Sequence, residues 1–140
     1  MKISTKGRYG LKALIDLAQC GNDGPVSITS ISSRQGISER YLEQLMSMLK
    51  KAGIINSIRG ANGGYIMAKP LSAISVGDVL RALEGDLHPV DCTEDTIEGC
   101  ESADSCVTKY VWQKIGDSIN QAVDEITIDQ LVGDCPHTLA

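Results

Sequence analysis

The chain has 140 residues, enough for one domain with its own core and too few for two. Its net charge is −5, yet residues 1–70 hold ten Lys and Arg against four Asp and Glu, whereas residues 71–140 hold three against fourteen. We therefore expect a basic half that meets a polyanion and an acidic half with another task. No apolar stretch approaches the roughly 18 residues that cross a membrane, so we expect a cytoplasmic protein without membrane contact.

Three helical patterns are predicted in the first part of the chain, from apolar residues that recur every three or four positions. Each pattern follows a residue able to cap a helix and stops at a glycine. The three pairs are Ser4 or Thr5 with Gly21, Ser27 with Gly36, and Ser38 with Gly53. The second and third helices, joined by a tight turn that contains glycine, predict a helix-turn-helix.

After the third helix the apolar period becomes that of a strand. Residues 54–58 are short and β-branched, residues 59–64 contain three glycines, and residues 65–67 are able to pair back. A β-hairpin in this place predicts a winged helix-turn-helix. A capping box at Ser75 then opens a fourth helix, which ends at Gly85.

The acidic half predicts a different organisation. Residues 86–105 have no usable period, whereas a long helical pattern with an apolar stripe runs from Cys106 to about Ile126. A second copy of this helix is the expected cover, and folding back on the chain's own core is the alternative. The prediction is a mainly α fold with a small β-hairpin wing, divided into a DNA-binding domain at 1–85, a cysteine segment at 86–105, and a dimerisation helix with a tail at 106–140.

The start of the third helix is the predicted reading surface, because the second helix of a helix-turn-helix enters the major groove. Its polar side chains are Ser38, Glu39, Arg40, Tyr41, Glu43 and Gln44. Arg40 suits guanine, Gln44 suits adenine, and Glu43 accepts from a cytosine amino group or repels a phosphate. Ser38 and Tyr41 are expected to hold phosphates. The alternative is a solvated amphipathic helix without a ligand.

Further DNA contacts are expected outside the third helix. Arg59 and Gly60 lie in the predicted hairpin turn, where small residues allow close approach, so Arg59 is expected to enter a narrowed minor groove. The basic residues expected to contact phosphates are Lys2, Lys6, Arg8, Lys50 and Lys51. Binding that depends on such contacts weakens steeply with salt.

Three cysteines lie in the acidic segment with the spacing C-x7-C-x5-C: Cys92, Cys100 and Cys106. Thiols grouped in this way favour an iron–sulfur cluster, with zinc and free redox-active thiols as alternatives. Five cysteines in a reducing compartment favour metal or redox use over disulfides. Cys20, at the end of the first helix, is expected to pack as a small hydrophobe.

Four stretches carry a family resemblance: ISTKGRYG, ISERYLEQLMSMLKKAGII, SIRGANGGY and ISVGDVLRALEG. Together they resemble the IscR-type family of winged-helix transcription regulators, over residues 1 to about 132. The resemblance implies a homodimeric repressor that binds a palindromic operator in double-stranded DNA, with iron–sulfur assembly proteins as further partners. The sequence contains no catalytic motif, so an enzyme is not expected.

The resemblance also implies that the three cysteines hold a 2Fe–2S cluster that controls operator binding. In that family a His three residues after the third cysteine completes the site, whereas this chain has Lys109 there. The predicted candidates for the fourth ligand are Cys135 and His88, with Glu101, Asp104 or an exogenous ligand left open. The alternative is a cluster-free repressor of the same fold, controlled by thiols, zinc or a partner protein.

Overall fold

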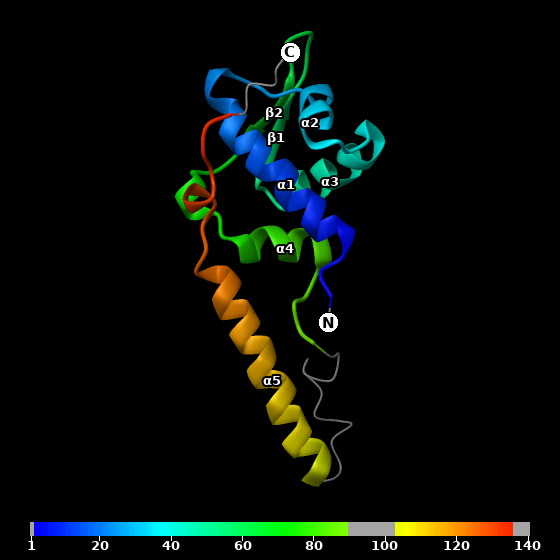
Figure 1. Cartoon of the computed structure of the whole chain (residues 1–140), viewed down its shortest axis with the longest axis vertical. Coiled ribbons are helices and arrows are strands. Elements are labelled where there is room, and N and C mark those ends of the chain that lie inside the picture. The colour runs from blue at the N-terminus through cyan, green and yellow to red at the C-terminus, as the bar shows by residue number, and fades with distance from the viewer. Residues whose placement is uncertain (1, 90–102, 136–140) are drawn as a thin grey trace.

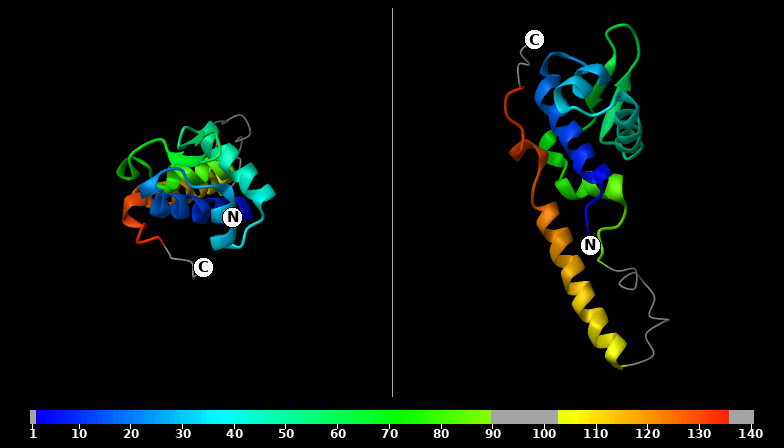
Figure 2. Two further views of the ribbon diagram at one scale, coloured as in Figure 1. Left: turned by 90° about the horizontal axis from the view of Figure 1, so that it is seen from above. Right: turned by 45° about the vertical axis from the view of Figure 1, so that its right-hand side comes forward.

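The computed structural model describes residues 2–89 and 103–135, with side chains from residue 107 onward in the second range. Its helices and strands are α1 (Thr5–Cys20), α2 (Ile28–Gln35), α3 (Glu39–Lys51), β1 (Ile55–Ile58), β2 (Gly64–Met67), α4 (Val76–Glu84) and α5 (Ala103–Asp124). Short 3-10 turns lie at Gly21–Asp23, Leu71–Ala73 and Ile128–Gln130. The two strands pair antiparallel, with Ile55 opposite Met67. Helices α1 and α3 contact the hairpin, α2 and α4 pack against these two helices, and α5 extends well beyond them (Figures 1 and 2).

The predicted caps start the first four helices. Each of these helices opens with a serine hydroxyl that accepts a backbone N–H of the first turn: Ser4, Ser27, Ser38 and Ser75. Ser75 and Asp78 complete a reciprocal capping box. Helix α2 ends at Gly36, whose φ of 66° lies in the left-handed region that favours glycine. Local signals therefore set the boundaries of the winged helix-turn-helix.

One apolar core unites these elements, and burial of each large side chain contributes roughly 1.5–3 kcal/mol. Its large, fully buried members are Leu14, Leu17, Ile31, Leu42, Leu45, Met46, Leu49, Ile55, Ile74, Val79, Leu87 and Ile128. Leu87 precedes α5 and Ile128 follows it. The winged-helix core is therefore completed by segments from the acidic half of the chain.

Helices α1 and α4 approach closely because α1 places glycines on their shared face. A Cβ at Gly10 would lie 2.3 Å from Leu83 Cδ1, and one at Gly7 would lie 2.7 Å from Glu84 Oε1. The Glu84 carboxylate accepts the backbone N–H of Gly7 at 3.0 Å and that of Ser4 at 3.1 Å. Helix α4 thus packs against the start of α1 and also satisfies its free N–H groups.

The substitution Gly10→Ala is expected to destabilise the fold. Alanine gains about 0.5–1 kcal/mol in helix propensity, but overpacking against Leu83 costs about 1–3 kcal/mol, for a net loss of ~1–2 kcal/mol. Urea denaturation measures this change. In a Leu83→Ala background the added methyl group has room, so there Gly10→Ala should be neutral or stabilising. An equal loss in both backgrounds would contradict the steric explanation.

The apolar stripe of α5 divides into two halves. Ile119 and Val123 pack against the core, and Arg81 of α4 donates hydrogen bonds to Asn120 at 3.3 Å and Asp124 at 2.5 Å. The N-terminal half is exposed, by 65% at Val107, 63% at Tyr110, 43% at Val111 and 40% at Ile115. Packing of α5 against the chain's own core, the alternative to a second copy, therefore covers the stripe only in the C-terminal turns of α5.

Residues 125–135, predicted as a tail, return along the winged-helix part. The Val76 N–H donates to the Ile126 carbonyl at 2.8 Å, and the Ile128 N–H donates to the Ile74 carbonyl at 2.9 Å. This segment, orange to red in Figure 1, then runs toward the end of α1, and the right-hand view of Figure 2 shows the same course. The chain thus closes on its first helix.

Candidate DNA interface and cysteine sites

The outer face of α3 carries the side chains predicted to read DNA. Five of them are exposed: Ser38, Glu39, Arg40, Glu43 and Gln44. The opposite face of α3 is buried in the core through Leu42, Leu45, Met46 and Leu49. Because one face is fixed and the other is free, α3 presents its polar row in a single orientation.

Tyr41 is half-buried and holds the start of α3 against α1. Its hydroxyl donates to Thr5 Oγ1 at 3.2 Å, and its ring meets Tyr9 edge to face with the ring centroids 6.2 Å apart. The exposed side chains of Lys6 and Arg8 stand on this same part of α1. The structure thus brings the basic start of α1 beside the predicted reading surface, and a phosphate contact by Tyr41 itself stays a prediction.

The two acidic side chains of the reading surface face different neighbours. Glu39 accepts a hydrogen bond from Thr29 Oγ1 at 2.6 Å, which ties α3 to α2. Burial first, and the negative charge of Glu43 second, raise the pKa of the Tyr65 phenol in β2 of the wing. Glu39 therefore has a structural role that the sequence did not reveal.

The wing turn presents Arg59 on an exposed loop. Gly60 beside it has a φ of 116°, which side chains rarely adopt. Reciprocal N–H···O hydrogen bonds of 2.9 Å between Val26 and Tyr65 fix the hairpin on the segment that enters α2. At Gly64 a Cβ would lie 2.4 Å from the Val26 carbonyl oxygen, so this contact requires glycine.

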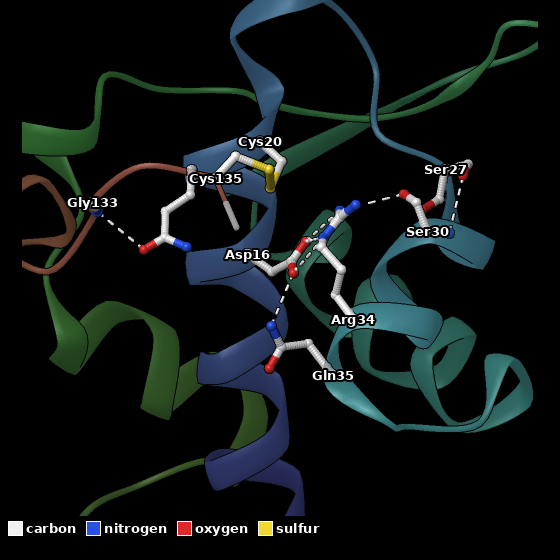
Figure 3. Close-up of a disulfide and its surroundings, with 9 residues drawn as sticks. Asp16, Cys20, Ser27, Ser30, Arg34, Gln35, Gly133 and Cys135 are labelled. Carbon is white, nitrogen blue, oxygen red and sulfur yellow. Dashed lines mark hydrogen bonds and ion pairs between the residues drawn. A yellow bond between two sulfur atoms is a disulfide. The ribbon is translucent and has the colours of Figure 1, made fainter. Parts of the chain in front are cut away.

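A buried carboxylate anchors α2 on α1. Asp16 is 1% exposed and accepts hydrogen bonds from Arg34 Nη2 at 2.7 Å, Arg34 Nε at 2.9 Å and Gln35 Nε2 at 2.9 Å (Figure 3). Hydrogen bonding to Asp16 raises the pKa of Arg34, so the guanidinium stays charged. This anchor was not predicted from the sequence. Its signal was an Asp flanked by Ile15 and Leu17 inside an apolar helix.

Two cysteines are joined by a disulfide, which the sequence did not predict. Cys20 and Cys135 are bonded with their Cα atoms 4.8 Å apart (Figure 3). Cys20 packs against the core as predicted, but as one half of a disulfide instead of as a free thiol, and the expectation of no disulfide is wrong for this pair. The two residues are 115 positions apart, and neither neighbourhood in the sequence points to the other.

The predicted cluster ligands lie mostly outside the described residues. Cys92 and Cys100 belong to the range 90–102, and Cys106 lies in the first turns of α5 without a described side chain. Within residues 2–89 and 107–135, no three His, Cys, Asp or Glu side chains are grouped to hold a metal ion.

Cys135, one predicted fourth ligand, lies far from Cys106. Helix α5 has 22 residues and is therefore about 33 Å long. Cys106 stands near its start, whereas Cys135 follows its end and is bonded to the last residue of α1. In Figure 1 that end of α1 and the start of α5 lie at opposite ends of the molecule. Its sulfur is also bonded to Cys20, so in this state it has no thiolate to offer. The structure does not bring these two cysteines together.

His88, the other predicted fourth ligand, packs on the middle of α5. A Cβ at Gly116 would lie 2.8 Å from His88 Cδ2. Gly116 is ten residues after Cys106, about 15 Å along the helix, whereas a metal–ligand bond measures about 2 Å. His88 Nδ1 lies 2.6 Å from Asp86 Oδ1. In this arrangement His88 and Cys106 do not share one metal site.

The exposed half of α5 forms an apolar groove of about 560 Å³. It is lined by Tyr110, Val111, Lys114, Ile115, Ser118, Ile119 and Ala122. A soluble monomer rarely leaves such a continuous apolar surface open, so the groove indicates a protein-binding face.

The fold and the polar face of α3 define a winged helix-turn-helix transcription regulator. Residues 3–134 match the Rrf2 family, described as an iron-dependent transcriptional regulator. The chain belongs to this family. In the described part of the chain, no helix combines the length and apolar character needed to cross a membrane.

Known relatives agree with this assignment. The HTH-type transcriptional regulator CymR of Bacillus subtilis is 43% identical over 131 residues, 94% of this chain and 89% of that protein. The regulator IscR of Yersinia enterocolitica is 42% identical over 132 residues, 94% of this chain and 79% of that protein. The solved structure of T. potens IscR is 46% identical, with a TM-score of 0.74 over 94% of this chain and 85% of that one. The predicted family and fold are confirmed, and the chain is a DNA-binding regulator rather than an enzyme.

Proposed function

We propose that this chain is a homodimeric repressor of a palindromic operator, whose affinity is controlled by a 2Fe–2S cluster held by Cys92, Cys100 and Cys106. The observation that carries the DNA-reading part is the exposed polar row of α3, fixed beside the wing. Within this row Arg40, Glu43 and Gln44 read base edges. Phosphate contacts that set the register come from Ser38, Tyr41, Lys2, Lys6 and Arg8. Arg59 beside Gly60 enters a narrowed minor groove, and Glu39 lies at the edge of the reading surface, tied to Thr29.

The exposed half of α5 supports the homodimer. A second copy of the same apolar face covers it with matching chemistry, as symmetric interfaces do. Each copy then brings one α3 to one half of the operator. The proposal assigns DNA binding to residues 1–85, control to residues 86–105 and dimerisation to residues 106–140, in a protein that works in the cytoplasm.

Three thiols in one short segment, together with IscR relatives, support the cluster. When bound, the cluster supplies a redox-sensitive cross-link among the three thiolates. Its fourth position falls to the cysteine segment or to an exogenous ligand, because Cys135 and His88 lie elsewhere. Iron–sulfur assembly proteins are the proposed source of the cluster.

Anaerobic purification followed by iron and sulfide analysis tests the cluster. Replacement of Cys92, Cys100 or Cys106 by Ser is expected to remove most of the bound iron. Replacement of Cys20 or Cys135 by Ser is the matched control, and these variants should keep their iron. A colourless wild-type protein after reconstitution would overturn the cluster proposal.

A cluster-free, thiol-controlled repressor is the second candidate. The disulfide between Cys20 and Cys135 and the relationship to CymR favour it. The same purification separates the two candidates, because a cluster-free protein contains no sulfide. In that case operator binding should follow the thiol state of the protein instead of its iron content.

The two kinds of DNA contact should respond differently to substitution. Lys6→Ala is expected to weaken all sequences alike and to reduce the slope of log affinity against log salt by about 0.9. Arg40→Ala should cost about 1–3 kcal/mol on the operator and relax the preference at one base pair. Fluorescence anisotropy with the operator and single-base variants measures both changes. Equal salt slopes for Lys6→Ala and wild type would refute the phosphate contact.

A further inference from the structure

The disulfide closes the chain at one particular place. Cys20 is the last residue of α1, and Cys135 ends the returning segment 125–135. The same segment is held by a second contact nearby, a hydrogen bond of 3.0 Å from the Gly133 N–H to Gln19 Oε1 (Figure 3). Before Gly133, the segment is fixed by the fully buried Ile128. Within the described residues, the bond therefore restrains only the part that follows the 3-10 turn at Ile128–Gln130, residues 131–135.

Both cysteines are reachable from solvent. They are half-buried and line a pocket of about 520 Å³ together with Ser27, Ser30 and Arg34. Residues 61–63 of the wing turn line the same pocket. A small reagent that enters this pocket comes next to both cysteines, and residues of α2 and of the wing turn line the same pocket.

The same end of α1 also positions the helix-turn-helix. Cys20 follows Asp16 by four residues, about one helical turn. Asp16 holds Arg34 and Gln35 of α2, and Figure 3 shows this anchor beside the disulfide. A covalent bond at Cys20 restrains fraying of the helical turn on which α2 depends.

We propose that Cys20 and Cys135 are a thiol–disulfide switch, oxidised by low-molecular-weight disulfides, that locks residues 131–135 onto α1 and stiffens α2 and the wing. The inference rests on the proposed function, because a repressor in a reducing cytoplasm carries its thiols reduced and forms disulfides as a redox signal. The switch is separate from Cys92, Cys100 and Cys106. It acts with or without a cluster.

The oxidation is an ordinary double thiol–disulfide exchange. One protein thiolate attacks a sulfur of the small disulfide, which forms a mixed disulfide and releases one small thiolate. The second protein thiolate attacks the protein sulfur of the mixed disulfide and releases the other small thiolate. The protein pair loses two electrons and two protons, and the small disulfide is reduced to two thiols.

Oxidised glutathione added to the full-length reduced protein tests the switch. A variant with Ser at Cys92, Cys100 and Cys106 leaves only the two relevant thiols. Mass spectrometry is expected to find both thiols lost without a retained glutathione. Amide exchange of the oxidised protein should slow at least threefold in residues 131–135 and in α2. Stable glutathione adducts on both cysteines, or unchanged exchange, would overturn the proposal.

Operator binding is the second readout. The oxidised protein should bind at least threefold more tightly than the reduced protein, because a stiffened α2 and wing lose less freedom on binding. The Cys20→Ser/Cys135→Ser variant should show no response to glutathione. Equal affinity of both forms would overturn the regulatory role. A disulfide that forms in a protein without operator binding in any state would instead refute the proposed function.

Discussion

Replacement of Asp16 by Ala is expected to lower the free energy of unfolding by about 3–5 kcal/mol, because it leaves the Arg34 guanidinium without its partner. The Asp16 side chain is fully buried and that of Arg34 is 13% exposed. A lost charge partner costs little at the surface, where pairs contribute about 0–1 kcal/mol, and much more in the interior. The free energy of unfolding of a domain of this size is about 5–15 kcal/mol in total, so this substitution removes a large part of it.

Urea denaturation of matched variants separates the charge from the packing. Arg34→Met removes the charge that Asp16→Ala would strand, so the double variant should be more stable than Asp16→Ala alone. Gln35 also donates to Asp16, and Gln35→Ala is the control for one hydrogen bond to the carboxylate from an uncharged donor, at about 1.5–3 kcal/mol. A loss below about 1 kcal/mol for Asp16→Ala, the surface-pair range, would mean that water reaches Arg34 and that α2 is held by its apolar face.

The boundaries of the winged helix-turn-helix could be predicted because the signals that set them are local. A serine cap acts on N–H groups two or three residues away, as at Ser75, and a glycine stop acts on its own φ, as at Gly36. Both are visible in a short stretch of sequence. The exposed face of α3 followed from helical spacing in the same way.

Contacts between distant residues were not predictable. The Asp16–Arg34 pair and the Cys20–Cys135 bond need the relative position of two elements, which spacing along the chain does not contain. Ile128 was missed for the same reason, since an isolated Ile after a long helix does not reveal that it completes a distant core. Contacts between residues far apart in the sequence, and not the helices themselves, were therefore the part of the structure that could not be predicted.

The split of the α5 stripe also escaped prediction. Helical spacing showed one continuous apolar face, but α4 is short and covers only the end of α5 that carries Ile119 and Val123. The remaining turns project beyond the core with their apolar side chains exposed. This length mismatch is the physical basis for expecting a second copy on the open half.

Replacement of Ile115 by Glu is expected to separate the proposed dimer and to weaken operator binding by about 10²–10⁴-fold. A carboxylate at the centre of the apolar groove would be buried without a partner in the interface. A monomer binds each half-site independently and so loses the gain from binding two linked sites, which is about 10²–10⁴-fold. Analytical ultracentrifugation and anisotropy measure the two effects.

The position of Ile115 keeps this test free of a folding defect. Its side chain is 40% exposed in the single chain, so a Glu side chain there is solvated in the monomer and the winged-helix core should keep its stability. Gln113→Glu, two residues earlier and outside the apolar groove, also introduces a carboxylate and should stay dimeric. Because the reading helix is untouched, the monomeric Ile115→Glu variant should still bind a single half-site with the salt dependence of one subunit. A dimer that persists in the Ile115→Glu variant would place the second copy on another face of α5.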